Sequence, residues 1–81
     1  MDKMPKQIRQ HYNDFINGMD EANKKDEVKS KVTFGLTEMA PTGNLMIVPF
    51  DVNTVSESNA KYSTLHRHVW AKMQGQWHLT V

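Results

Sequence analysis

Hydrophobic positions change their spacing near residue 30, and this change divides the chain into a helical part and a strand-forming part. Residues 5 to 28 carry an apolar stripe with spacings of three and four, formed by Ile8, Tyr12, Phe15, Met19 and Ala22. That spacing is typical of an amphipathic helix. Pro5 suits its first turn, and Asp2 is the expected cap before it. Because the stripe is too short for a stable coiled coil, we expect the helix to pack on a sheet.

From residue 30 onward apolar and polar residues alternate, which predicts β-strands. Residues 41 to 43, Pro-Thr-Gly, suit a three-residue hairpin loop in which the glycine takes the left-handed conformation. This loop predicts three apolar cross-strand pairs, namely Leu36 with Val48, Phe34 with Phe50, and Val32 with Val52. The sequence therefore predicts a hairpin with one core face.

A second hairpin is predicted near the end of the chain. A three-residue loop at 73 to 75, Met-Gln-Gly, places Trp70 opposite His78 and His68 opposite Thr80. The predicted core face then carries Leu65, Arg67, Val69, Ala71, Trp77, Leu79 and Val81. The opposite face carries His66, His68, Trp70, Lys72, Gln76, His78 and Thr80. A two-residue loop would mix these two sets, so the three-residue register is the preferred interpretation.

Two further expectations concern the connection between the hairpins and the order of the strands. Residues 53 to 63 are polar and are expected to form a long loop, a kind of segment that is often functional or mobile. Pro49 has no N–H, so the strand at 45 to 52 is expected at a sheet edge. The predicted fold is α+β: one N-terminal amphipathic helix packed on a four-stranded antiparallel sheet, in the order α-β-β-β-β with two hairpins, as a single domain over residues 1–81.

Composition narrows the classes of function. The 81 residues include ten Lys and Arg and nine Asp and Glu, for a net charge of +1, so no global field attracts nucleic acid or an anionic membrane. The absence of cysteine excludes disulfides and cysteine-based metal sites. The start of the chain does not resemble a signal peptide, and its apolar runs are too short to span a membrane. We expect a cytoplasmic protein.

The histidines are candidates for a metal site or for catalysis. His66, His68 and His78 share one face in the predicted register, and three imidazoles at such spacing can hold zinc or iron. A histidine-based metal-binding protein, or a small metal-dependent enzyme, is therefore one alternative. However, no G-x-S-x-G, P-loop or H-E-x-x-H motif is present in the sequence. We expect no enzymatic activity and no cofactor.

Trp70 and Lys72 lie on the same predicted face as the histidines. A tryptophan beside a cation can stack on a nucleobase, which makes single-stranded nucleic-acid binding a further alternative. Few other basic residues lie near this pair, so we expect that nucleic acid is not the partner.

Protein binding is the function that the pattern favours. A single helix covers one face of a sheet, and the other face is predicted to show Thr33, Gly35, Thr37, Met39, Leu45, Ile47 and Pro49, together with Trp70 and the histidines. Exposed patches of this kind mark protein contacts. We expect a binding module, either an adaptor or an inhibitor of the kind that phages also encode, which acts as a homodimer through a sheet face and an edge strand. The predicted binding residues are Trp70, His66, His68, His78, Lys72, Leu45 and Ile47.

Overall fold

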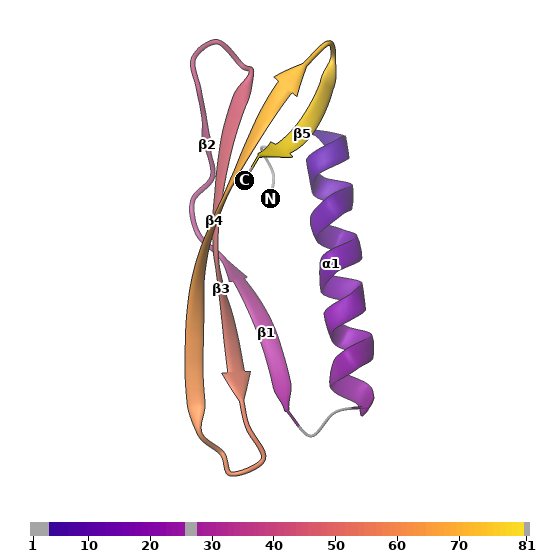
Figure 1. Ribbon diagram of the computed structural model, residues 1–81, viewed down its shortest axis with the longest axis vertical. Helices are drawn as coiled ribbons and strands as arrows, with labels where there is room; N and C mark the ends of the chain where they lie inside the picture. Colours follow the sequence, from indigo (N-terminus) through magenta and orange to yellow (C-terminus); the bar gives the residue numbers. More distant parts are fainter. Residues whose placement is uncertain (1–3, 26–27, 81) are drawn as a thin grey trace.

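The α+β fold is confirmed, with one helix and an antiparallel sheet (Figure 1). The computed structural model describes residues 4–25 and 28–80. Its elements in chain order are α1 (Lys6–Lys25), β1 (Lys29–Phe34), β2 (Glu38–Met39), β3 (Leu45–Val55), β4 (Lys61–Met73) and β5 (Gln76–Thr80). Within these ranges no helix has the length and apolar character needed to cross a membrane.

Helix α1 forms where the apolar stripe predicts it. The amide of Arg9 donates to the carbonyl of Pro5 at 2.9 Å, so Pro5 immediately precedes the first helical residue, Lys6, and accepts the first hydrogen bond of the helix. Ile8 and Tyr12 are fully buried, which confirms the stripe as the core-facing side. The helix ends at Lys25, earlier than predicted, and the proposed cap Asp2 lies outside the described residues.

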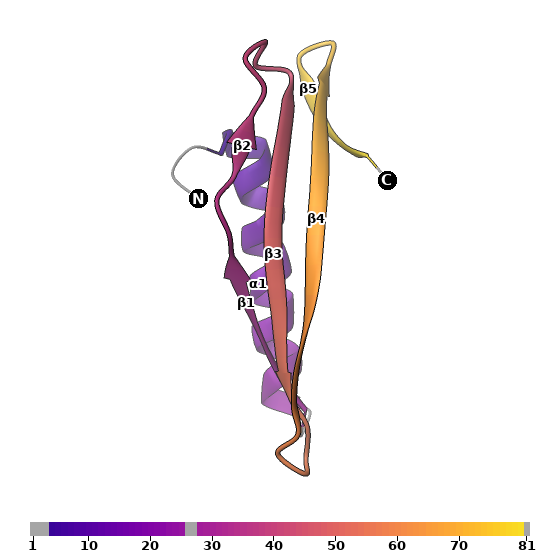
Figure 2. The ribbon, with the colours of Figure 1, turned by 90° about the vertical axis from the view of Figure 1, so that its left-hand side faces the viewer.

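The sheet has the strand order β1, β3, β4, β5, and β2 pairs with β3 in line with β1. Helix α1 covers one face, and the opposite face has no covering element among residues 4–25 and 28–80 (Figures 1 and 2). The predicted edge position for β3 is wrong, because β1 and β2 flank it on one side and β4 on the other. The physical reason lies at Pro49.

Pro49 is accommodated inside the sheet at an interruption of the neighbouring strand. Gly35 donates its N–H to the Pro49 carbonyl at 2.9 Å, so these residues form a hydrogen-bonded pair. The second bond of such a pair would run from the N–H of residue 49 to the Gly35 carbonyl, and proline cannot make it. This position lies just after β1 ends at Phe34 and before β2 begins. A Cβ atom on Gly35 would lie 3.1 Å from the Pro49 ring, so glycine permits this close approach.

The first hairpin follows the predicted register over part of its length. The pairs of Val32 with Val52 and of Phe34 with Phe50 are confirmed. Nearer the loop the register shifts by one residue, and Met39 lies opposite Met46 on the helix-covered face instead of on the open one. The loop therefore has the four residues 41 to 44, and the predicted pair of Leu36 with Val48 is absent.

The predicted long polar loop is also wrong. β3 and β4 continue as a paired ribbon as far as Val55 and Lys61, which leaves residues 56 to 60 as the connection. The predicted register of the second hairpin is wrong by one residue. Gln74 and Gly75 both have positive φ, at 53° and 78°, and form a two-residue loop of the kind preferred in hairpins.

This one-residue difference exchanges the two faces of β4. Met46 lies opposite Trp70, and Trp70 lies opposite Leu79, so Trp70 belongs to the helix-covered face. The buried core consists of Met4, Ile8, Tyr12, Met46, Val48, Phe50, Trp70 and Trp77. The predicted core residues Leu65, Arg67, Val69 and Ala71 lie instead on the uncovered face, whereas Val81 lies outside the described residues.

Candidate protein-binding surfaces

The structure separates the predicted binding residues into two groups. His66, His68 and Trp70 face the helix, because they lie opposite the core residues Phe50, Val48 and Met46. Lys72, which is exposed, lies opposite Trp77. His78 lies opposite Ala71, on the uncovered face with Leu45 and Ile47.

This separation removes the observations on which two alternatives depend. His78 is on the other side of the sheet from His66 and His68, and the described part of the chain contains no group of three or more His, Cys, Asp or Glu residues suited to a metal. Trp70 is 4% exposed, so its ring is not available to stack on a base.

Trp70 is held in the core by a hydrogen-bonded chain that the sequence did not reveal. Its indole Nε1 donates to the Tyr12 hydroxyl at 2.8 Å, and the same hydroxyl lies 2.9 Å from Nδ1 of His68. An indole N–H is a donor alone, so the Tyr12 oxygen accepts from Trp70 and keeps its own proton and a second lone pair for the contact with His68. The direction of that second bond follows the His68 tautomer: Nδ1 accepts the phenol proton when the imidazole proton is on Nε2, and Nδ1 donates when the proton is on Nδ1.

Burial shifts the pKa values of Tyr12 and His68, and neighbouring imidazoles add to the shift of His68. Desolvation raises the pKa of Tyr12 despite the opposing effect of the Trp70 hydrogen bond, so the phenol keeps its proton. Desolvation lowers the pKa of His68, and His11 and His66 lower it further. His66 stacks on Phe50 with ring centroids 5.0 Å apart. His66 and His68, which are half-buried, therefore pack as aromatic groups at the margin of the core.

The depressed pKa of His68 predicts a loss of stability in mild acid. The unfolded chain, with a histidine pKa near 6.5, takes up this proton more readily than the folded protein. The stabilising contribution is therefore fully present above pH 6.5 and decreases as the pH falls below it. We expect a lower urea midpoint at pH 5 than at pH 7.5.

The matched control for this pH effect is His68→Gln, which keeps an acceptor near Tyr12 but does not titrate. We expect the pH dependence to be weaker in this variant, whereas His78→Gln on the other face should retain it. An equally steep dependence in His68→Gln would show that another group is responsible.

The sheet face that is turned away from α1 (Figure 2) carries mostly apolar side chains, and we call it the open face. It is defined by Leu45, Ile47 and Pro49 of β3 together with Leu65, Arg67, Val69 and Ala71 of β4. Leu45 is 44% exposed and Leu65 is 77% exposed. Leu36 is 81% exposed and lies beside this face, where it lines a shallow hollow with Ile47 and Leu65. Leu45 and Ile47 are therefore on the exposed surface, as the sequence predicted.

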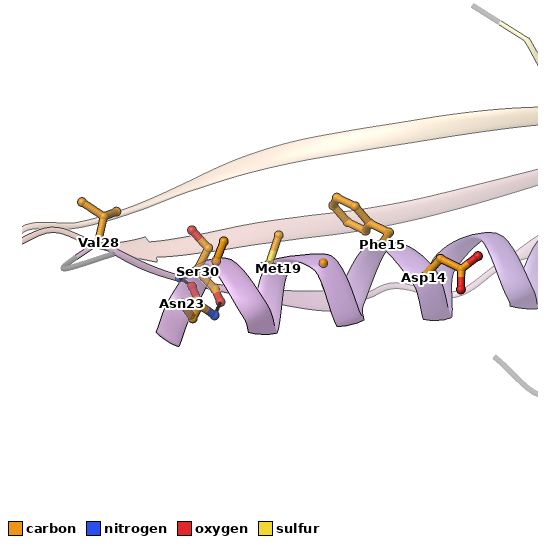
Figure 3. Close-up of a pocket in the computed structure, with 8 residues that line it drawn as sticks. Asp14, Phe15, Met19, Asn23, Val28 and Ser30 are labelled. Atoms are coloured by element: carbon orange, nitrogen blue, oxygen red, sulfur yellow. Dashed lines mark hydrogen bonds between the residues drawn. The ribbon is translucent and has the colours of Figure 1, made fainter. Parts of the chain in front are cut away.

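A second apolar hollow lies on the other side of the sheet, under the second half of the helix. Phe15 and Met19 extend from α1 toward the strands, and Val28 lies beyond them (Figure 3). Phe15 is 38% exposed and Val28 is 40% exposed. The helix packs tightly on the sheet around Ile8 and Tyr12, whereas its second half leaves this groove open.

Two edges of the sheet are capped by amide side chains of the helix. Gln7 brackets Trp77 of β5: its Nε2 donates to the Trp77 carbonyl at 2.8 Å and its Oε1 accepts from the Trp77 N–H at 3.1 Å. Asn23 brackets Ser30 of β1 in the same manner: its Nδ2 donates to the Ser30 carbonyl at 2.6 Å and its Oδ1 accepts from the Ser30 N–H at 2.9 Å. Covering of this kind blocks the addition of another strand. Sequence reasoning missed both caps, since amides on the polar side of a helix carry no distinctive signal.

Comparisons with protein-family models, curated proteins and solved structures found no match for this chain.

Proposed function

We propose that this protein is a cytoplasmic, non-enzymatic protein-binding module, an adaptor or an inhibitor, which binds a partner protein on its open face. The observation that carries this proposal is the apolar character of the two central strands on their uncovered side. Leu45 and Leu65 are largely exposed there, beside Ile47 and Val69. A face of this kind, bordered by polar residues, has the composition of a protein interface.

The charges around the open face suit a mixed polar rim. Arg67 lies on β4, and Glu38 lines the same hollow as Leu36, Ile47 and Leu65. Opposite signs at a rim orient a partner without creating the uniform positive field of a nucleic-acid site. A chain without cysteine suits a reducing compartment, which supports the cytoplasmic assignment.

Site-specific photo-crosslinking in the producing cells tests this function. A photoreactive phenylalanine analogue at Leu45 should give discrete adducts with a partner protein, identified by mass spectrometry. The same analogue at Asn17, an exposed position on the helix, is the matched control and should not give these adducts. Adding Ile47→Arg should reduce the Leu45 adducts at least about tenfold, because a charge at the centre of an apolar contact is desolvated.

The folding of each variant is checked by circular dichroism. Equal adduct patterns from Leu45 and Asn17, or adducts that survive Ile47→Arg in a folded protein, would contradict binding through the open face.

A further inference from the structure

Strand β4 has an unpaired edge over half of its length. Every residue of Lys61–Ala71 pairs with β3 on one side, but β5 pairs with β4 only over Val69–Met73. The stretch Lys61–His68 therefore has no strand on its outer side within the described part of the chain. We call this stretch the free edge; Figure 2 shows β5 beside one end of β4 and not the other.

The hydrogen-bonding pattern identifies which backbone groups point outward. Met73 and Gln76 flank a two-residue loop, so they form a hydrogen-bonded pair, and alternate residues of β4 point to the same side. The N–H of Lys72 donates to the backbone carbonyl of Asn44 at 2.8 Å, which confirms that the backbone N–H and C=O groups of even-numbered β4 residues point toward β3. The N–H and C=O groups of Ser63, Leu65 and Arg67 therefore point outward from the free edge.

The free edge differs from the edges of β1 and β5. Gln7 and Asn23 each occupy both backbone groups of one residue on those strands. No described side chain brackets Leu65 in this manner, and its own side chain is 77% exposed. An unprotected edge of this kind is a template for an added strand.

We propose that the free edge binds the free edge of a second copy of this chain, antiparallel about a two-fold axis at Leu65. Ser63 then pairs with the partner's Arg67, Leu65 with the partner's Leu65, and Arg67 with the partner's Ser63. Each pair exchanges two backbone hydrogen bonds. The result is one continuous sheet across both copies, with a self-complementary interface of the kind that two-fold dimers use.

Two observations favour a second copy as the occupant, and a third selects its register. An incoming strand must fit between the loop at 56 to 60 and the start of β5 pairing at Val69, and the free edge of another copy has the same length. Leu65 meets an identical apolar side chain across the axis. The register centred on Thr64 would place Lys61 opposite Arg67, and like charges directly opposite are unfavourable. The register centred on Leu65 avoids this contact.

The inference goes beyond the proposed function, because it concerns the outward backbone groups of β4, whereas the proposed function concerns the side chains of the open face, to which Leu65 also contributes. Each can fail alone. The first test measures the solution mass of the untagged protein by sedimentation over a range of concentrations. We expect a dimer that dissociates on dilution, and Leu65→Pro should weaken it at least about tenfold, since proline removes an outward N–H without breaking a bond to β3.

Leu79→Pro is the matched control, because Leu79 is also an exposed leucine on an edge strand. Its N–H points away from β4, as does that of Trp77 two residues earlier. It should leave the dimer intact. A wild-type protein that stays monomeric at the highest concentration would overturn the inference. So would a dimer that survives Leu65→Pro, or one that Ile47→Arg disrupts while Leu65→Pro does not, since the latter result would assign the interface to the open face.

The register is tested by disulfide trapping in this cysteine-free chain. In the proposed dimer the two Leu65 positions form a hydrogen-bonded pair with Cα atoms about 5.5 Å apart, within the range of a disulfide. Leu65→Cys should therefore cross-link under mild oxidation. Ser63→Cys should not, because its two copies lie four residues out of register, about 13 Å apart. Equal cross-linking of both variants would contradict the proposed axis.

Discussion

Replacing Trp70 with alanine is expected to lower the free energy of unfolding by about 3–5 kcal/mol. The side chain is 4% exposed and is part of the buried core. Its removal leaves a cavity beneath the helix and takes away the donor to Tyr12. Since small domains have a total stability of about 5–15 kcal/mol, we expect a large fraction of the variant to be unfolded at 37 °C. Urea unfolding followed by circular dichroism measures this loss.

Met73→Ala is the control for this prediction. Met73 is also a large apolar residue of β4, but it is 52% exposed and lies outside both the open face and the free edge, so its replacement should change the unfolding free energy by less than about 0.5 kcal/mol. If Trp70→Ala were as mild as Met73→Ala, Trp70 would be a surface residue and the two-residue turn at 74 and 75 would be the wrong register.

Removing one oxygen atom by Tyr12→Phe is expected to cost about 1–3 kcal/mol. The ring remains and continues to pack against Phe34 and Phe50, whose ring centroids lie 5.4 Å and 6.0 Å from that of Tyr12. However, the indole N–H of Trp70 loses its acceptor, and Nδ1 of His68 loses its hydrogen-bond partner. Leaving buried polar groups without partners is costlier than the net value of the bonds themselves. Equilibrium unfolding in urea at pH 7.5 gives the value.

Tyr62→Phe is the matched control, because the Tyr62 side chain is 57% exposed and water can satisfy its hydroxyl group. We expect its effect to be within about 0.5 kcal/mol. Similar losses in Tyr12→Phe and Tyr62→Phe would mean that the Tyr12 hydroxyl does not anchor Trp70 and His68 in solution.

The two proposed binding surfaces belong to the same pair of strands but use different chemistry. The open face offers apolar side chains, whereas the free edge offers backbone hydrogen bonds at Ser63, Leu65 and Arg67. Pairing two copies at the free edge would leave their open faces side by side on one continuous sheet. Such an arrangement would double the surface available to a partner, and two linked sites can bind more tightly than one.

The histidines show why the candidate site was difficult to predict from the sequence. His66 and His68 alternate correctly for either face of a strand, and imidazole is polar enough for the surface and aromatic enough for a core. The predicted three-residue register placed them on the exposed face, because that register separates the histidines from the apolar residues of the hairpin. The structure places them against Phe50 and Tyr12, and the hydroxyl group that makes this burial possible comes from a helix 56 residues away in sequence.

The sequence by itself determined the features that depend on neighbouring residues. These are the amphipathic helix around Ile8 and Tyr12, the change to strands after residue 30, the left-handed glycine at 43 and the pairing of Phe34 with Phe50. Each follows from local spacing or from the conformational preference of one residue.

The tertiary structure alone decided which face of β4 the helix covers. A shift of one residue in register moves every side chain of a strand to the other face, so local spacing leaves two solutions of similar appearance. The turn at Gln74 and Gly75 and the hydrogen bonds from Tyr12 select one of them. The strand order was decided in the same way, because Pro49 is tolerated where β1 ends rather than at an outer edge. The contacts of Tyr12 with Trp70 and His68, and that of Gly35 with Pro49, join residues that are separated in the sequence, and no local pattern contains them.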